Sequence, residues 1–453
     1  MAPAAYQVMR AAHLGAVQAA LNDHVARLDW SRGQIERYQQ HRLRSLLSYA
    51  KARSPFHARR LAALDPSRAT VADLTSLPVM TKQDAQDNWD AISTAPGLDR
   101  AAAERVLVEQ RWFSYLDEYQ IFSSGGSSGA RGVYVWDWDF YVSAACLAWR
   151  VQAREEQRAQ PVSARLAVLT AGTPPHASTP LFDVPTAAGM TTVVIAAGAP
   201  FGELLAAVAA ARPTHLVGYP TVIGRLARAS VAGDLQIAPV RVSTNSEPLL
   251  DEDRRAIIEA WQPVVIHNLW GSTEIGVQAV GCGQAAGLHV CEDEVVLERV
   301  DADGVPVDPG QPAVRTLATG LANRTFPFIR YDLGDQVAPL PGDCPCGSAL
   351  ARVADIGGRR DDDFRYSDIT VPPIVFRHVL GTDARISEYQ VIQTATGADI
   401  VVVGTPDAEK LAAALTTALH HYGMAQPVVR IRLTDSLNRH QASGKLRRFI
   451  PLV

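Results

Sequence analysis

The middle of the chain alternates between short runs rich in β-branched residues and longer helical segments. Two of the helical segments, 202–211 and 251–261, lie between such runs, and residues 31–60, near the start, predict a basic amphipathic surface helix. Strands that alternate with helices favour a parallel sheet with helices packed on its faces. The pattern therefore predicts an α/β fold, with strands at 166–169, 192–196, 215–217, 240–243 and 264–267.

The pattern changes after about residue 285. Residues 295–300 and 305–307 flank an Asp-Ala-Asp-Gly turn and predict a β-hairpin within a smaller antiparallel β region. A cluster of Gly, Arg and Asp at 357–363 then marks a second boundary. The last part, of about 90 residues, predicts a compact α+β unit with strands at 389–392, 400–403 and 428–433 and a helix at 407–420.

The bulk composition excludes several classes of protein. The chain has 453 residues, enough for two or three domains and for a sizeable core without disulfides. Its net charge of −4 gives no reason to expect nucleic acid or an anionic membrane as a partner, and five cysteines are too few for a disulfide framework. No apolar stretch is long enough to span a membrane, and the first residues do not resemble a signal peptide. We therefore expect a cytoplasmic protein.

The segment Ser123–Gly132 combines four serines and four glycines in ten residues. Glycine lets backbone N–H groups approach an anion closely, and serine hydroxyls add donors, so this loop can hold the phosphates of ATP. A flexible linker has the same composition, and the segment alone does not decide between the two. It is not a Walker loop, because no Gly-Lys-Ser/Thr follows.

Five further polar segments follow this loop, and one of them comes directly after the predicted strand at 264–267. Polar turns at the carboxyl ends of parallel strands are where α/β sheets place ligands. In order, the six segments are Ser123–Gly129, Asn245–Pro248, Asn268–Glu274, Arg330–Asp335, Gly358–Asp362 and Ser443–Lys445. Together they resemble the adenylate-forming enzymes, and most closely the phenylacetate–CoA ligase branch. Such enzymes join a carboxylic acid to AMP and then pass the acyl group to a nucleophile.

The resemblance covers nearly the whole chain and implies its domain organisation. It implies a large N-terminal domain, residues 1–358, with mainly parallel sheets and a β subregion at about 280–350. A small, mobile α+β lid domain, residues 362–453, would turn about a hinge near Asp361 between two half-reactions. The family also suggests a homodimer.

The resemblance assigns roles to the nucleotide-binding residues. Trp270 would stack by the adenine, Thr273 would lie by the phosphate, and Glu274 would hold Mg²⁺, for which a carboxylate is a suitable ligand. Asp335 would accept both ribose hydroxyls, and Arg359 would assist at the ribose. The full set of implied ATP-binding residues is Ser123, Ser124, Gly125, Gly126, Ser127, Ser128, Gly129, Ser246, Glu247, Pro248, Asn268, Trp270, Gly271, Ser272, Asp335 and Arg359, with Ser246–Pro248 on the far side of the adenine.

Lys445 follows a Ser-Gly pair that predicts a flexible turn. The resemblance makes it a catalytic residue, together with Thr273 and Glu274, that reaches the substrate carboxylate and the α-phosphate. An ammonium there would stabilise developing charge. The alternative is a basic C-terminal tail, since arginines adjoin Lys445. Arg359 likewise has an alternative, a salt bridge to the acids at 361–362.

Three cysteines and a histidine have the spacing of a metal site. Cys282, His289, Cys344 and Cys346 form Cys-x6-His followed by Cys-x-Cys, and Zn²⁺ favours four sulfur and nitrogen ligands in closed structural sites. Several relatives in the resembled branch look to carry zinc here. Cys291 is a competing ligand, and free thiols are the alternative. Four protein ligands leave no open position, which speaks against a zinc hydrolase.

The acyl acceptor and the substrate are less constrained. Family members that make thioesters carry a glycine-containing segment after the hinge, whereas residues 363–368 contain no glycine. CoA is the acceptor that we expect first. A carrier-protein thiol, an amine, nitrite chemistry on an aryl amine and a non-catalytic nucleotide-binding relative are the alternatives. An aromatic acid is expected, because Thr170, Ala171 and Gly172 leave room for a ring on which Tyr219 could stack.

Overall fold

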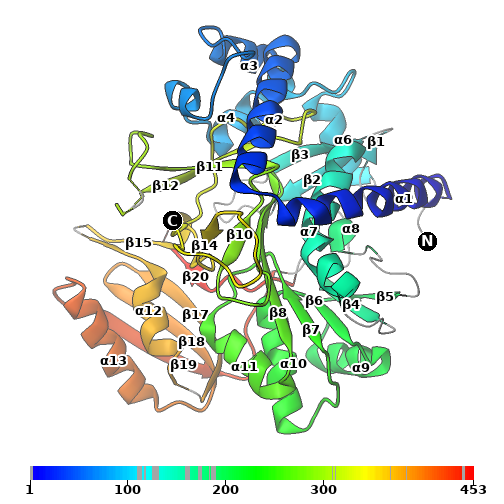
Figure 1. Cartoon of the computed structure of the whole chain (residues 1–453). Coiled ribbons are helices and arrows are strands. Elements are labelled where there is room, and N and C mark those ends of the chain that lie inside the picture. Colours follow the sequence, from blue (N-terminus) through cyan, green and yellow to red (C-terminus); the bar gives the residue numbers. More distant parts are fainter. Residues whose placement is uncertain are drawn as a thin grey trace.

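The structure is a computed structural model of the chain (Figure 1). It describes residues 4–452 apart from 110–114, 117–118, 125–131, 159–163, 172–175, 183, 185–189, 309, 312, 368, 384 and 441–443. The largest sheet is made of β4 (Arg165–Thr170), β5 (Thr191–Ala196), β6 (His215–Gly218), β7 (Arg241–Thr244), β8 (Val265–Ser272), β9 (Gly276–Val280), β10 (Leu288–Val290) and β14 (Arg352–Val353). In space these strands follow the order β14, β10, β9, β8, β7, β6, β4, β5.

The five strands predicted from the apolar runs are all present, and they form the parallel part of this sheet. β5 pairs with β4, β4 with β6, β6 with β7 and β7 with β8, each in parallel. The α/β class is therefore confirmed. The remaining strands, β9, β10 and β14, extend the sheet in antiparallel fashion beyond β8.

Helices cover both faces of the parallel part, which explains why the central strands β4 and β6 are buried almost throughout. Successive side chains of a strand point to opposite faces. Along β4, Val168 belongs to one core cluster and its neighbour Leu169 to the other. The covering helices are α7 (Trp138–Arg158), packed against α1 (Ala4–Ala26), on one face, and α9 (Phe201–Ala211), α10 (Pro220–Ala232) and α11 (Asp251–Trp261) on the other (Figure 1).

β8 runs past its predicted end and turns directly into β9. The sequence places a polar loop at 268–274, but most of that segment continues the strand, and only Thr273–Ile275 form the turn. Leu269 and Trp270 pair with residues of β9, so cross-strand pairing overrides the turn-like composition. Gly276 closes the turn with a φ of +83°, a conformation that glycine adopts without strain.

The predicted hairpin after residue 285 is only partly correct. β11 (Val295–Val300) is present, but it pairs along its whole length with β12 (Arg315–Gly320), which in turn pairs with β13 (Tyr331–Asp332). The predicted turn exists, with the Asp301 amide donating to the Val305 carbonyl. After it, a single bridge joins Val300 of β11 to Pro306, beside the hydrogen bond that the Val307 amide donates to the Arg299 carbonyl.

The N-terminal helical segment is confirmed as two helices, α2 (Arg32–Arg53) and α3 (Pro55–Arg60). They separate at Ser54, whose hydroxyl accepts a hydrogen bond from the His57 amide and caps α3. α1 and α7 were not predicted. Among the described residues, we find no helix whose length and apolar character would let it cross a membrane.

The last part of the chain, here called the lid, folds around a four-stranded sheet with its own core (Figure 1). Every element predicted for it is present, with bounds shifted by a few residues. The lid consists of α12 (Pro373–Leu380), β17 (Ile386–Thr394), β18 (Gly397–Gly404), α13 (Ala408–His421), β19 (Val428–Thr434) and β20 (Phe449–Ile450), preceded by the short pair β15 (Phe364–Arg365) and β16 (Thr370–Val371). The boundary at 358–362 and the hinge near Asp361 remain proposals, which this separate core supports.

Candidate active site

A cavity of about 540 Å³ lies between the carboxyl ends of the central parallel strands and the lid. Open α/β sheets bind ligands at this edge. The predicted site residues on its wall are Ser123, Ser124, Ser246, Glu247, Pro248, Asn268, Trp270, Gly271, Ser272, Thr273, Glu274, Asp335, Arg359, Asp361 and Lys445. Three further sets of predicted positions, Gly125–Gly129, Gly172 and Ser443, lie outside the described residues.

Two tyrosine hydroxyls hold the carboxylate of Glu274 in place. The hydroxyl of Tyr134, on β3 (Gly132–Asp137), donates to Oε1 of Glu274 at 2.7 Å, and that of Tyr331 donates to the same oxygen at 3.1 Å. Burial raises the pKa of both tyrosines, so each stays a neutral donor. An oriented carboxylate at the cavity wall is a suitable ligand for Mg²⁺. Tyr331 lies in the Arg330–Asp335 segment named from the sequence, without a role of its own, whereas nothing in the sequence pointed to Tyr134, on a strand far away in the chain.

Trp270, Asp335 and Arg359 form a connected group on the wall. The Trp270 indole donates to Oδ2 of Asp335 at 2.8 Å, and Nε of Arg359 lies 3.5 Å from Oδ1 of the same carboxylate. Arg359 also donates to the Leu333 carbonyl at 2.9 Å. Burial raises the pKa of Asp335, and the charge of Arg359 opposes that shift. Trp270 and Arg359 thus orient the Asp335 carboxylate from two sides. The guanidinium of Arg359 pairs with Asp335, and the backbone N–H of Arg359 donates to Asp362.

The strand residues beside Trp270 have structural partners of their own. Asn268 donates to Asp355 at 2.7 Å and accepts from Thr244 at 2.9 Å. The Ser272 hydroxyl accepts from the Ile275 amide at 3.1 Å, which fixes the turn that carries Thr273 and Glu274. A Cβ on Gly271 would lie 2.8 Å from the carbonyl oxygen of Gly276, so only glycine fits the strand there.

Glu247, on the cavity wall, contacts the lid. Its Oε1 accepts from the Leu446 amide at 2.9 Å, and its Oε2 accepts from the Thr221 hydroxyl at 2.7 Å and from the Thr221 amide at 3.3 Å. Ser246, which precedes it, has a φ of +67° and donates to Asn245 at 2.9 Å. The turn at Ser246 therefore directs the Glu247 carboxylate to the residue that follows Lys445.

Lys445 enters the cavity from the lid. Its Nζ lies 5.4 Å from the centre of the Tyr219 ring. Burial lowers the pKa of Lys445, the nearby Glu247 carboxylate raises it, and Arg359 lowers it. The Lys445 ammonium is thus buried against the large domain. A solvated basic tail, the alternative interpretation, would not require this position.

A second lysine, Lys82, also lines the cavity, and it was not among the predicted site residues. It begins α4 (Lys82–Asp87). The preceding Met80 exchanges backbone hydrogen bonds with the chain on either side of Tyr331, which carries Lys82 towards Glu274. Burial lowers the pKa of Lys82, while the charge of Glu274 raises it. The signal in the sequence was the segment Leu77–Lys82, which also resembles the phenylacetate–CoA ligase branch but to which no role was assigned.

The apolar end of the cavity differs from the predicted acyl pocket. Thr170, Ala171 and Tyr219 are fully or almost fully buried, and the Ala171 amide donates to the Tyr219 hydroxyl at 3.1 Å, so these residues support the wall from behind. Burial raises the pKa of Tyr219 to about 12. The residues of the large domain that do line the cavity include Trp136, His176, Ala177, Ser178, Leu181, Phe182, Leu269, Gly276 and Val277.

The four predicted metal ligands converge on one point. The donor atoms of Cys282, His289, Cys344 and Cys346 all lie within 4.8 Å of one another, and all four residues are buried. The Sγ atoms of Cys282 and Cys344 are 3.5 Å apart, close to the ~3.8 Å expected around a tetrahedral Zn²⁺. Sγ of Cys346 lies 3.3 Å from Nε2 of His289. Cys291, the competing ligand, is not in this group.

No family model matches the chain. Among curated proteins, it is 25% identical over 380 residues, 81% of this chain and 80% of the relative, to a phenylacetate–coenzyme A ligase of Thermus thermophilus. Among solved structures, it is similar to a 2-hydroxyisobutyryl-CoA ligase in the postadenylation state in complex with R3-HIB-AMP, with a TM-score of 0.73, 18% identity and coverage of 94% and 91% of the two chains. An anthranilate CoA ligase in complex with anthranoyl-AMP gives a TM-score of 0.50 at 16% identity, over 72% of this chain and 65% of that one.

The TM-score depends on the state of the solved ligase. The same 2-hydroxyisobutyryl-CoA ligase in the thioesterification state, with 2-HIB-AMP and CoA, gives 0.61 at the same identity and coverage. The structure described here is therefore more similar in overall arrangement to the postadenylation state.

Proposed function

We propose that the chain is a member of the adenylate-forming superfamily, and that it activates a carboxylic acid with ATP and passes the acyl group to the thiol of CoA. The observation that carries this proposal is the convergence of Lys445, from the lid, with Glu274 and Asp335, from the large domain, on one cavity. A domain that only binds a nucleotide has no need of a buried lysine from a second domain. The similar proteins of known activity are CoA ligases.

In the first half-reaction, a carboxylate oxygen of the acid attacks the α-phosphorus of ATP. The bond from that phosphorus to the bridging oxygen of pyrophosphate breaks, and pyrophosphate leaves with the electron pair. Lys445 stands beside the carboxylate and the α-phosphate, where its charge lowers the energy of the crowded anions. Asp335 accepts the ribose hydroxyls, Trp270 flanks the adenine, and Glu274 holds Mg²⁺, which when bound neutralises phosphate charge.

In the second half-reaction, the thiol sulfur attacks the acyl carbon, the bond from that carbon to the AMP oxygen breaks, and AMP leaves. The lid turns about the hinge near Asp361 to admit the thiol. Residues 363–367 contain no glycine, and Phe364 is fully buried beside the hinge. Because this segment differs from the one expected of a CoA tunnel, a carrier-protein thiol or an amine is the second candidate for the acceptor.

An aromatic acid is the proposed substrate. Trp136 and Phe182 place two rings on the apolar part of the cavity wall, and Leu181 and Val277 add aliphatic surface. Aromatic pairs add about 0.5–1.5 kcal/mol beyond the burial of their area, so such a wall favours a ring. His176 lies at the same end, and burial together with the charge of Lys445 lowers its pKa to about 4, so it faces the substrate uncharged at neutral pH.

The Cys/His group is proposed to bind one structural Zn²⁺. Cys282 follows β9, His289 lies on β10, and the two remaining cysteines lie in the loop before β14. A metal there would tie the antiparallel edge of the large sheet to that loop. It would take no part in the reaction, since four protein ligands leave no position for a substrate.

Acid-dependent exchange of labelled pyrophosphate into ATP tests the first half-reaction. We expect exchange with at least one member of a panel of aryl acids, and its loss in Lys445→Ala. Lys410→Ala, a substitution at an exposed lysine of α13, is the matched control and should exchange at the rate of the unmodified protein. Exchange that persists in Lys445→Ala would contradict the role given to that lysine.

A further inference from the structure

Two groups of charged residues fasten the lid to the large domain, one at each end of the segment that carries Lys445. Arg439 lies six positions before Lys445 and Arg448 three positions after it. Both arginines contact helices α10 or α11 of the large domain. We call these two groups the Arg439 anchor and the Arg448 anchor.

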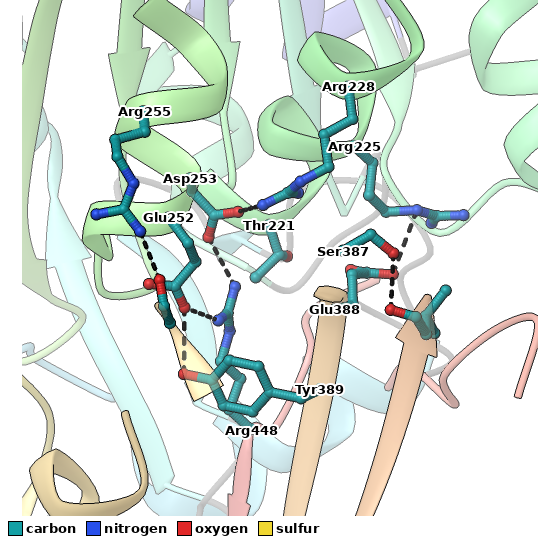
Figure 2. A network of polar contacts seen from close by, with 12 residues as sticks. Thr221, Arg225, Arg228, Glu252, Asp253, Arg255, Ser387, Glu388, Tyr389 and Arg448 are labelled. Atoms are coloured by element: carbon teal, nitrogen blue, oxygen red, sulfur yellow. Dashed lines mark hydrogen bonds and ion pairs between the residues drawn. The ribbon is translucent and has the colours of Figure 1, made fainter. Parts of the chain in front are cut away.

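The Arg448 anchor is a pair of short ion pairs to the first turn of α11. Nη1 of Arg448 donates to Oε1 of Glu252 at 2.7 Å, and Nη2 donates to Oδ2 of Asp253 at 2.6 Å (Figure 2). The guanidinium also lies 5.0 Å from the centre of the Tyr389 ring, and Asp253 accepts a further bond from Arg228 at 3.1 Å. Asp253 is completely buried, so this contact is shielded from water.

In the Arg439 anchor the lid supplies the acid and the large domain the arginine, the reverse of the Arg448 anchor. Glu388 of the lid, which is buried and paired with Arg439, lies 3.4 Å from Nε of Arg225 on α10 (Figure 2). Arg439 itself donates to the Thr221 hydroxyl at 2.9 Å. The same hydroxyl donates to Glu247, which holds the amide next to Lys445, so this anchor is continuous with the contacts of the catalytic segment.

The lid presents a positive charge to the large domain at one anchor and a negative charge at the other, so the two anchors together favour one docked orientation. Arg448 meets Glu252 and Asp253, and Glu388 meets Arg225, only while the lid is docked, and a buried ion pair specifies geometry more than it adds stability. If the lid were rotated or shifted, these contacts between the lid and the large domain would be lost, and Asp253 would keep only Arg228 and Glu388 only Arg439.

We propose that Arg448 and Arg439 are positioning residues of the adenylation half-reaction, which hold Lys445 in the cavity and are dispensable for the transfer of the acyl group. The inference rests on the proposed function. It follows that the second half-reaction, in which the lid leaves this orientation, does not use either anchor.

The test separates the two half-reactions in Arg448→Met. Acyl-AMP formation is measured in a single turnover with ATP, Mg²⁺ and an accepted aryl acid, and thioester formation is measured after supplying preformed acyl-AMP and CoA. Hydrogen bonds to charged groups are strong enough to change a rate about 10- to 150-fold, and we expect acyl-AMP formation to fall by that factor with the KM for ATP unchanged. Thioester formation should keep its rate. Arg430→Met, which removes an exposed lid arginine paired with Asp399 of the lid, is the matched control.

Glu252→Gln provides a second variant in case Arg448→Met does not fold. It removes the same ion pair from the large-domain side, and its effect should not add to that of Arg448→Met in the double variant. Acyl-AMP formation at the normal rate in either folded variant, or an equal loss in both half-reactions, would overturn the inference while leaving the proposed function in place. An unmodified protein that forms no acyl-AMP with any acid would remove the proposed function, and this inference with it.

Discussion

Replacing Glu247 by glutamine distinguishes a residue that serves the Lys445 segment from one that lines the adenine. The carboxylate accepts from the Leu446 amide at 2.9 Å and from the Thr221 hydroxyl at 2.7 Å. Glutamine keeps the shape but replaces one acceptor oxygen by a donor and removes the charge. A hydrogen bond to a charged group contributes about 1.5–3 kcal/mol, so we expect acyl-AMP formation to slow about 10- to 150-fold.

The same change has a pH signature with a defined sign. The charge of Glu247 raises the pKa of Lys445, which burial lowers. Without that charge the pKa of Lys445 falls further. Because the ammonium is the active form, the rate is lost as the pH rises through this pKa, and in Glu247→Gln the loss begins at a lower pH than in the unmodified protein.

Rapid-quench measurement of acyl-AMP over a range of ATP concentrations and pH values checks both expectations. Glu259→Gln, at an exposed position on α11, is the matched control. The reasoning is refuted if the variant raises the KM for ATP with an unchanged maximal rate, since that result would indicate that Glu247 contacts the adenine. An alkaline limit that does not move would refute the electrostatic part alone.

Three further predictions concern the metal sites and the core. Tyr331→Phe removes one hydrogen-bond donor to Glu274 and should raise the Mg²⁺ concentration that gives the half-maximal rate about 2- to 10-fold. An unchanged Mg²⁺ titration would contradict this. Purified protein should contain one zinc per chain by elemental analysis, and its removal by a chelator should lower Tm; well under one zinc in chelator-free protein would remove this site. Arg150→Met leaves the buried Asp293 with only Arg27, at 3.5 Å, and should cost about 3–5 kcal/mol in urea unfolding, whereas unchanged stability would show that the Arg150–Asp293 pair is replaceable.

The sequence predicted those parts of the fold whose signal is local. The central parallel strands β4 and β6 are buried on both faces and therefore appear as apolar runs, and helix α11 begins and ends at the predicted residues. The antiparallel edge was missed because its strands, such as β10 and β14, are short and exist through pairing with distant segments. The end of β8 was misplaced because its pairing with the next strand, β9, overrides a polar composition.

The candidate site shows the same division. Short motifs identified the residues that meet at the cavity wall, because each motif lies at the end of a strand or in a turn. The sequence could not show the direction of a side chain, such as that of Glu247, which contacts the Leu446 amide of the lid. Nor could it find Tyr134, whose place depends on its contact with Glu274, or Lys82, whose place depends on the pairing of Met80 with the Tyr331 segment.

Transfer of oxygen from the acid to AMP tests the central claim most directly. An aryl acid that supports pyrophosphate exchange is labelled with ¹⁸O in its carboxylate and incubated with the protein, ATP, Mg²⁺ and CoA. The masses of the products are then measured by mass spectrometry. Attack of the carboxylate on the α-phosphorus leaves one labelled oxygen on AMP, together with an acyl thioester, and this is the predicted result. AMP that carries no label would contradict an acyl adenylate as the intermediate.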